Sequence, residues 1–381
     1  MNRKDQIQPL KILGIIFGLI IAFVILVSVS KKPVEEKQEV IQEPEIISSV
    51  INNTNKDVIY LAKGGTYKLN YSFVSNKEKT LRTLNYTSAD INIAQVSLSG
   101  EIKGIDNGET DIIISIDNLK ESIHVLVTDL LLPIRNDLQY TKPNLSCDQV
   151  SEEENDLLDS ILKDRINDAG YGTRAGVVAA ARFLLLELPY RISYFFENGR
   201  IGYADGEGRY YHEGLYLNKS RYSNLKSSSE FGPACWGCSM HSRTANDTEQ
   251  NGLDCSGLVT WALLNGGFDC GDVGAGGVGY NPNTLFFLGE RENTSKDNFN
   301  KIQAGDLVHN KKAGGHIGIV IGVEKEKIYV AQATWQDPSI FTKPYGVTVT
   351  EYNIEEFIKD WKEVMLMDSY YKESGNYSAM W

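Results

Sequence analysis

The chain has 381 residues, of which 42% are apolar and 23% are charged. This composition suits two or three globular domains and excludes a collagenous, coiled-coil or wholly disordered chain. The formal net charge of −12 and the pI near 5.1 argue against a broad basic face for nucleic acid or an anionic membrane surface. We therefore expect no nucleic-acid partner, and a partner that is neutral, cationic or zwitterionic.

Residues 12–29 form an apolar run without a charge, and a helix of this length measures roughly 27 Å, close to the thickness of a bilayer core. The run predicts a transmembrane helix. Arg3, Lys4 and Lys11 precede it, which places residues 1–11 in the cytoplasm. Because no small-x-small cleavage site or lipobox cysteine follows, an uncleaved anchor is favoured over a cleaved signal peptide. We expect a single-pass protein of the cell membrane, with its N-terminus inside and the remainder extracytoplasmic, in a Gram-positive bacterium.

Residues 30–56 are charged, poor in aromatic residues and interrupted by Pro33 and Pro44. Such a composition is typical of a linker, and we assign no fold to it.

Apolar residues alternate with polar ones through residues 57–128, as in Tyr67, Leu69 and Tyr71, and turn signals separate the alternating stretches. Short strands at this spacing predict a small all-β sandwich. The order NYTSADINIAQVSLSG, then GETDIII, then SIHVLV resembles the bacterial immunoglobulin-like group 2 (Big2) domain. The resemblance implies a spacer or an adhesive module.

Residues 129–172 are an acidic connector with a predicted helix from about Glu152 to Ile166. A second predicted helix follows, because Thr173 can cap the run AGVVAAARFLLLEL, which ends before Pro189. We expect this helix to open a C-terminal domain at residues 173–381.

A third predicted helix begins at the segment GLDCSGLV and stops at Gly266-Gly267, which places Cys255 in its first turn. A thiol at that position meets the positive end of the helix dipole and unpaired backbone N–H groups. Both favour the thiolate, the form that attacks a carbonyl carbon. Cys255 is therefore a candidate nucleophile, provided that a base lies nearby.

A strand that begins with a histidine, HIGIVIG, follows about sixty residues later, and the strand IYVAQA comes after a charged turn. Two adjacent antiparallel strands of this kind can bring His316 and Gln332 to one face. The imidazole of His316 can then take the thiol proton, while the Gln332 amide holds the other ring nitrogen.

The DCSG segment that opens a helix, the GD-L-V segment before a strand, and the HIGI-x-IG strand together resemble the NlpC/P60 cysteine peptidases of bacterial cell walls. The resemblance implies an α+β papain-like domain that hydrolyses peptide bonds in peptidoglycan stem peptides, often the bond from γ-D-glutamate to the diamino acid. It makes Cys255 the nucleophile, His316 the base and Gln332 the orienting residue. No cofactor and no metal is implied.

The family also has a tyrosine upstream of the cysteine, whose hydroxyl helps to stabilise the oxyanion. Tyr194 matches that position best and Tyr190 second, although the Trp-Gly-Gly that usually follows is missing here. We place Asp254 and Ser256, which flank the nucleophile, among the substrate-binding residues. An insertion at about residues 196–250 is longer than the family core requires and is expected to form a cleft wall or lid.

Five cysteines are present, and an odd number leaves at least one thiol unpaired if the others form disulfides. Within the insertion, Cys235, Cys238 and His241 have C-x-x-C-x-x-H spacing, which is compatible with part of a metal site, with a redox pair, or with structural disulfides or unpaired thiols. The last interpretation is favoured because no fourth ligand and no thioredoxin pattern is evident. Of the other histidines, His309 is an alternative base and His124 and His212 are more typical of surface positions.

These patterns favour a membrane-anchored peptidoglycan endopeptidase that uses a Cys-His-Gln mechanism. A CHAP-like amidase or an acyltransferase on the same core is the alternative within the enzyme class. A non-catalytic wall-binding or adhesive protein is the alternative outside it. Growth, cell separation and local wall opening for a secretion or conjugation apparatus all stay open as the biological setting.

Overall fold

The computed structural model describes residues 43–134, 150–194, 202–203, 209–210, 216, 236, 252–270, 273–276, 283–310, 315–334, 346–373 and 377. The chain divides into two compact units, one of residues 1–46 and 75–79 and the other of residues 47–74 and 80–381. Every candidate site residue belongs to the second unit.

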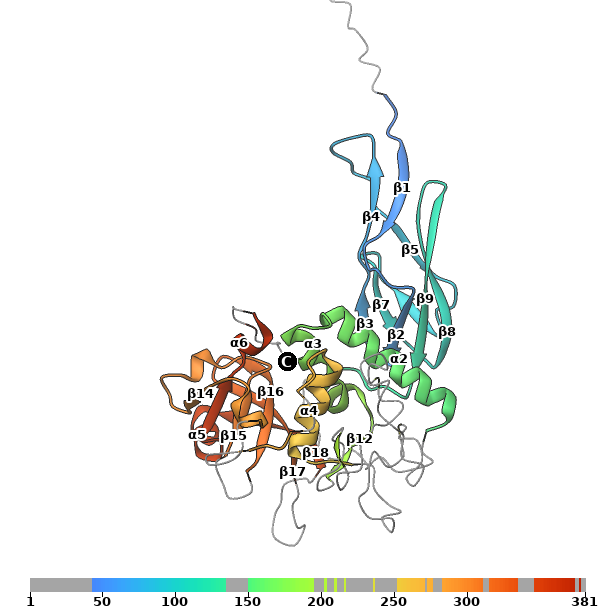
Figure 1. Ribbon diagram of the computed structural model, residues 1–381. Helices are drawn as coiled ribbons and strands as arrows, with labels where there is room; N and C mark the ends of the chain where they lie inside the picture. Colours follow the sequence, from blue (N-terminus) through green and yellow to red (C-terminus); the bar gives the residue numbers. More distant parts are fainter. Residues whose placement is uncertain are drawn as a thin grey trace, which may run out of the picture. The chain divides into compact units, whose positions relative to one another are not determined.

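From Ile47 to Thr128 the regular elements are strands (Figure 1). A four-stranded sheet has the order β2-β9-β8-β5, a three-stranded sheet has the order β3-β7-β6, and β1 pairs with β4. Alternate residues of the long strand β8 are buried, because successive side chains of a strand point to opposite faces. The strands are β1 (Ile47–Asn52), β2 (Val58–Ala62), β3 (Thr66–Lys68), β4 (Tyr71–Ser75), β5 (Asn85–Ser88), β6 (Ala94–Val96), β7 (Glu101–Gly104), β8 (Gly108–Ile116) and β9 (Leu119–Thr128).

Two helices follow where the sequence predicts them. Helix α2 (Glu152–Ala169) begins with a capping box, in which Ser151 and Glu154 bond each other's backbone N–H groups. Helix α3 (Arg174–Arg182) is capped by Thr173, whose hydroxyl accepts a hydrogen bond from the N–H of Gly176. It continues into a π-helical turn at Phe183–Glu187.

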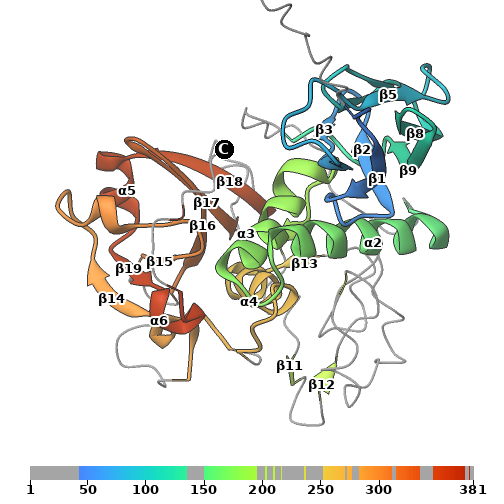
Figure 2. The ribbon, with the colours of Figure 1, turned by 90° about the horizontal axis from the view of Figure 1, so that it is seen from above.

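The C-terminal part is built around a six-stranded antiparallel sheet with the order β14-β19-β15-β16-β17-β18. Its strands are β14 (Glu290–Asn293), β15 (Leu307–His309), β16 (Ile317–Glu324), β17 (Lys327–Thr334), β18 (Gly346–Asn353) and β19 (Glu363–Leu366). Helix α4 (Cys255–Asn265) lies beside β16 and β17, as Figures 1 and 2 show. Two short helices, α5 (Ile354–Asp360) and α6 (Asp368–Tyr371), flank the last strands.

The six-stranded sheet is apolar on both faces, which fixes its position in the core. Ile317, Ile319 and Ile321 of β16 belong to the same buried cluster as helices α3 and α4. Val320, between them, belongs to a second cluster with Phe357 of α5 and with Trp361. A strand that is buried on both sides is held in one register, because a shift by one residue would exchange its two faces.

Four very short strands form two further pairs. β10 (Ser193–Tyr194) runs parallel to β13 (Gly252–Leu253), and β11 (Gly202–Tyr203) runs antiparallel to β12 (Arg209–Tyr210). The first pair leads directly into helix α4.

The predicted fold class is wrong. Of the residues that the structure describes, strand accounts for 37% and helix for 25%, and a helical papain-like α+β domain is not evident among them. Residues 57–128 form a four-stranded and a three-stranded sheet whose residues share one buried cluster, and β1, which lies within residues 30–56 where we expected no regular structure, pairs with β4 outside both sheets. We expected two strands after residue 305 and the structure has five. We did not predict β18, nor β15 and β19, which with three and four residues are too short to show a periodicity.

The predicted location also requires correction. Within the part of the chain that the structure describes, no helix is long and apolar enough to cross a membrane. The apolar run at residues 12–29 on which the single-pass prediction rested lies outside the described residues.

Candidate functional site

Cys255 is the first residue of α4, as the sequence predicts. Asp254 has an extended backbone and caps the helix, since its Oδ1 accepts hydrogen bonds from the Gly257 N–H at 2.5 Å and from the Ser256 hydroxyl at 3.0 Å. The residues from Ser256 to Asn265 are all buried. The cap and this burial together fix the direction in which the thiol of Cys255 points.

His316 immediately precedes β16 and is held at several points. Its backbone N–H donates to Asn310 Oδ1 at 3.0 Å, and its carbonyl oxygen accepts from the Asn310 N–H at 3.1 Å. Its imidazole stacks on the indole of Trp361, with ring centroids 5.3 Å apart and an interplanar angle of 19°. Its Nε2 lies 2.8 Å from Gln332 Oε1. The ring therefore has one fixed plane and one fixed edge.

Gln332 lies in β17, next to β16 in the sheet, and is buried. Its Nε2 donates to Thr350 Oγ1 at 2.9 Å and to the hydroxyl of Tyr352 at 3.3 Å, both on β18. The sheet thus brings His316 and Gln332 together, and the Gln332 amide lies between the imidazole and two hydroxyl groups.

Cys255, in helix α4, lies next to the start of strand β16. The backbone N–H of Ile317, the residue after His316, lies close enough to the Cys255 thiol to lower its pKa. Helix α4 packs on β16 and β17. The structure therefore collects Cys255, His316 and Gln332 from a helix and two strands, although 77 residues separate the first from the last.

Two opposing effects act on the pKa of the Cys255 thiol. Burial, followed by the negative charge of Asp254, raises the pKa of the thiol to about 11. The N–H groups of Ile317, Ser256 and Cys255 act in the opposite direction and favour the thiolate. They do not outweigh burial, so the helix N-terminus does not produce a thiolate by itself. Cys255 depends on a base.

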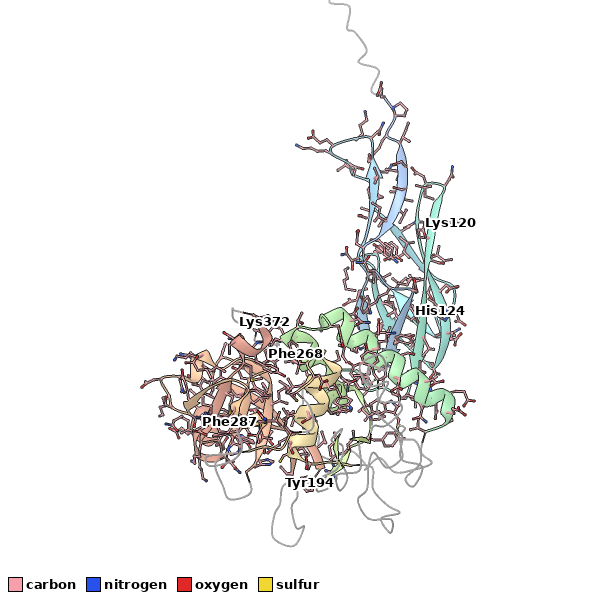
Figure 3. The ribbon with its side chains drawn as sticks, viewed as in Figure 1. Lys120, His124, Tyr194, Phe268, Phe287 and Lys372 are labelled. Carbon is pink, nitrogen blue, oxygen red and sulfur yellow. The ribbon has the colours of Figure 1, made fainter. Side chains whose placement is uncertain are left out.

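Tyr194 is half-buried in β10 and is aligned with Leu253 of the parallel strand β13 (Figure 3). Tyr194 therefore lies beside Leu253, which is two residues before Cys255 in the chain. Asp254 and Ser256, which we expected to bind substrate, are 5% and 4% exposed and bond to one another. Their hydrogen bonds serve the helix cap.

The other polar candidates lie elsewhere or are otherwise engaged. His309 is buried in β15, with Nε2 3.1 Å from the Gly276 carbonyl oxygen and its ring edge-on to Phe286. His124 lies on β9, between the carboxylates of Asp111 and Glu109 (Figure 3). Tyr190, the second choice for the upstream tyrosine, is half-buried and packs against the main core.

Some cysteines and histidines for which we had expectations lie outside the described residues: Cys147, Cys235, Cys238, His212 and His241. Among the described residues, Cys255 and Cys270 are not in disulfides, and no group of three histidine, cysteine or carboxylate side chains is placed to hold a metal. Trp236 of the expected lid is buried, and its Nε1 donates to Asp159 of α2 at 2.9 Å.

Sequence reasoning missed four residues that surround the site, Asn310, Thr350, Tyr352 and Trp361. Asn310 is close to His316 in the chain, so its position gave a weak signal. The other three contact His316 or Gln332 only because the strand order places β18 next to β17 and Trp361 over β16. No local pattern predicts such contacts.

No protein-family model matches the chain, and no curated protein resembles it. Among solved structures it is similar to domains 4 and 5 of the S-layer protein SbsC, with 20% identity over 22% of this chain and 54% of that one, and a TM-score of 0.20. Domains 5–6 of SbsC match with 18% identity over 29% of this chain and 58% of that one, and a TM-score of 0.21. The chain thus spans little more than half of each structure. Likeness at this level identifies neither a family nor a function.

Proposed function

We propose that the chain is a cysteine hydrolase that cleaves a peptide bond in the stem peptide of peptidoglycan. The observation that carries the proposal is the distance of 2.8 Å between His316 Nε2 and Gln332 Oε1, with the Cys255 thiol close enough to the N–H of the next residue, Ile317, for that N–H to lower the pKa of the thiol. A nucleophile, a base and an orienting group are the parts that thiol-dependent acyl transfer requires.

His316 is the base, acting through Nδ1, because its Nε2 is engaged by Gln332. Cys255 Sγ attacks the carbonyl carbon of the scissile amide as its proton passes to Nδ1. The C–N bond then breaks, and the imidazolium returns the proton to the leaving amine. Water hydrolyses the thioester after giving a proton to the same nitrogen, which releases a carboxylic acid and restores the thiol.

The oxyanion needs donors near the thiol. The backbone N–H groups of Cys255 and Ser256 lie in the first turn of α4, where a helix supplies no acceptors of its own, and both interact with the sulfur. Tyr194 is the side chain that we assign to the same task. Its pairing with Leu253 supports this assignment.

The substrate class rests on the likeness of DCSG and HIGI-x-IG to the NlpC/P60 peptidases. The bond from γ-D-glutamate to the diamino acid is the one that this likeness favours. The acidic chain is compatible with a substrate that carries free amino groups on its diamino acid.

The test is incubation of the purified chain with peptidoglycan and defined muropeptides, followed by mass spectrometry. We expect a new free amine within the stem peptide, and its loss in Cys255→Ala and His316→Ala. Asp111→Asn is the matched control, because Asp111 lies on β8, far in the sequence from the candidate site. We expect this variant to retain full activity. Release of intact stem peptides from the glycan would indicate an amidase, and wall binding without turnover would indicate a recognition protein; either outcome contradicts the proposal.

A further inference from the structure

A continuous set of hydrogen bonds crosses three neighbouring strands behind the imidazole of His316. It runs from His316 Nε2 to Gln332 Oε1 at 2.8 Å, and from Gln332 Nε2 to Thr350 Oγ1 at 2.9 Å and to the Tyr352 hydroxyl at 3.3 Å. The Gln332 amide is the middle member, and it has two chemically different ends. Which end faces His316 decides which ring nitrogen carries the proton.

With Oε1 toward the ring, as observed, His316 Nε2 must carry the proton in order to donate to it. Nδ1 then keeps its lone pair and can accept the thiol proton. If the amide turned over, its N–H would face Nε2, the proton would move to Nδ1, and the base would be blocked. A histidine in the wrong tautomer costs orders of magnitude in rate in other hydrolases.

Water cannot take over the role of the two hydroxyl groups easily, because Gln332 and Tyr352 are 7% and 4% exposed. An amide NH2 group has two hydrogens, and both find acceptors on β18. Without these acceptors the NH2 group would be buried unpaired, and an unpaired buried donor costs about 1–3 kcal/mol. Turning the amide would pair one N–H with His316 but leave Oε1 unpaired in its place, so without the two hydroxyl groups neither orientation of the amide is held.

We propose that Thr350 and Tyr352 are positioning residues that hold the Gln332 amide with Oε1 toward His316 and thereby fix the reactive tautomer of the base. The proposal rests on the proposed function, since it assigns the tautomer a purpose in catalysis. The tautomer itself can be measured without any substrate.

The experiment compares the full chain with the double variant Thr350→Val/Tyr352→Phe, which removes both hydroxyl groups with little change in volume. Thr350→Ser, which keeps a hydroxyl, is the conservative control. Long-range ¹H–¹⁵N spectra report which nitrogen of His316 is protonated, and His316→Ala assigns the signal among the five histidines. We expect the Nε2–H form in the parent chain and in Thr350→Ser, and a shift toward the Nδ1–H form in the double variant.

Muropeptide hydrolysis gives the second readout. We expect kcat of the double variant to fall by about 10- to 10³-fold with KM little changed, and Thr350→Ser to stay close to the parent. An unchanged Nε2–H tautomer in the double variant would overturn the proposal, as would an Nδ1–H form in the parent. If the tautomer shifts as expected but no variant hydrolyses muropeptides, the positioning role stands and the proposed function fails. Should the double variant not fold, Thr350→Val alone, at a half-exposed position, is measured in the same way.

Discussion

The surroundings of Cys255 disfavour the thiolate form that a nucleophilic thiol needs. Its pKa is raised to about 11, first by burial and then by the charge of Asp254, so at neutral pH the thiol is protonated unless His316 removes the proton. In His316→Ala we therefore expect the rate of Cys255 alkylation by iodoacetamide to keep rising with pH to beyond pH 10, because the thiolate fraction grows about tenfold per pH unit below the pKa. Peptide mapping by mass spectrometry follows Cys255 separately from Cys270. A plateau below pH 9 would contradict the raised pKa. Asp254→Asn is the matched variant: it keeps an oxygen for the helix cap and removes the charge, so alkylation at pH 8 should become faster.

At the same scale, the sequence singled out Cys255, His316 and Gln332 because each lies in a short local pattern, and their catalytic roles stay predictions. It did not predict the desolvation of the Cys255 thiol, because that desolvation depends on the strands that cover the thiol. For the same reason the sequence did not predict the roles of Thr350, Tyr352 and Trp361. Their contacts with His316 and Gln332 arise from strand pairing over 18 to 45 positions of sequence.

The helices that could be predicted are those whose ends carry their own signals. Thr173 is the clearest case, since its hydroxyl accepts from the Gly176 N–H at 3.2 Å and donates to the Gly170 carbonyl oxygen at 2.6 Å. We expect Thr173→Ala to lower the free energy of unfolding by about 1 kcal/mol and Thr173→Ser to retain most of it, measured from urea unfolding curves. Equal stability of the alanine and serine variants would show that the cap contributes nothing.

Other features of the elements carry no such signal. Gly266 and Gly267 predict only that α4 ends, but the structure gives the two residues different tasks. Gly267 has a φ of +102°, which favours glycine, whereas Gly266 has an ordinary φ of −71° and allows α3 to approach, since an added Cβ would lie 2.6 Å from Val177 Cα. The short strands β15 and β19 are likewise specified by their neighbours in the sheet. That is why the predicted fold class failed although several individual helices were predicted correctly.

At the scale of the whole molecule, one buried side chain joins segments that are far apart in the chain. Arg174, 2% exposed at the start of α3, donates to Asp306 Oδ1 at 2.8 Å and to the Ala304 carbonyl oxygen at 3.0 Å, and it also pairs with Asp368 of α6. Its guanidinium lies 4.9 Å from the centroid of the Tyr371 ring. The carboxylate of Asp306 in turn accepts from the N–H groups of Gln303 and Met367. Helix α3, the entry to β15 and the C-terminal helix are thus held by one charge network.

Removing one member of a buried ion pair leaves the other charge without compensation. We therefore expect Arg174→Met to lower the free energy of unfolding by about 3–5 kcal/mol, measured from urea unfolding curves. Asp306→Asn alone should also destabilise the fold. The double variant Arg174→Met/Asp306→Asn should lose less than the sum of the two single losses, with a coupling of about 0.5–3 kcal/mol, because it leaves no unpaired charge in the core. Strictly additive losses would mean that the two groups stabilise the fold independently and that packing, not charge, joins these three segments.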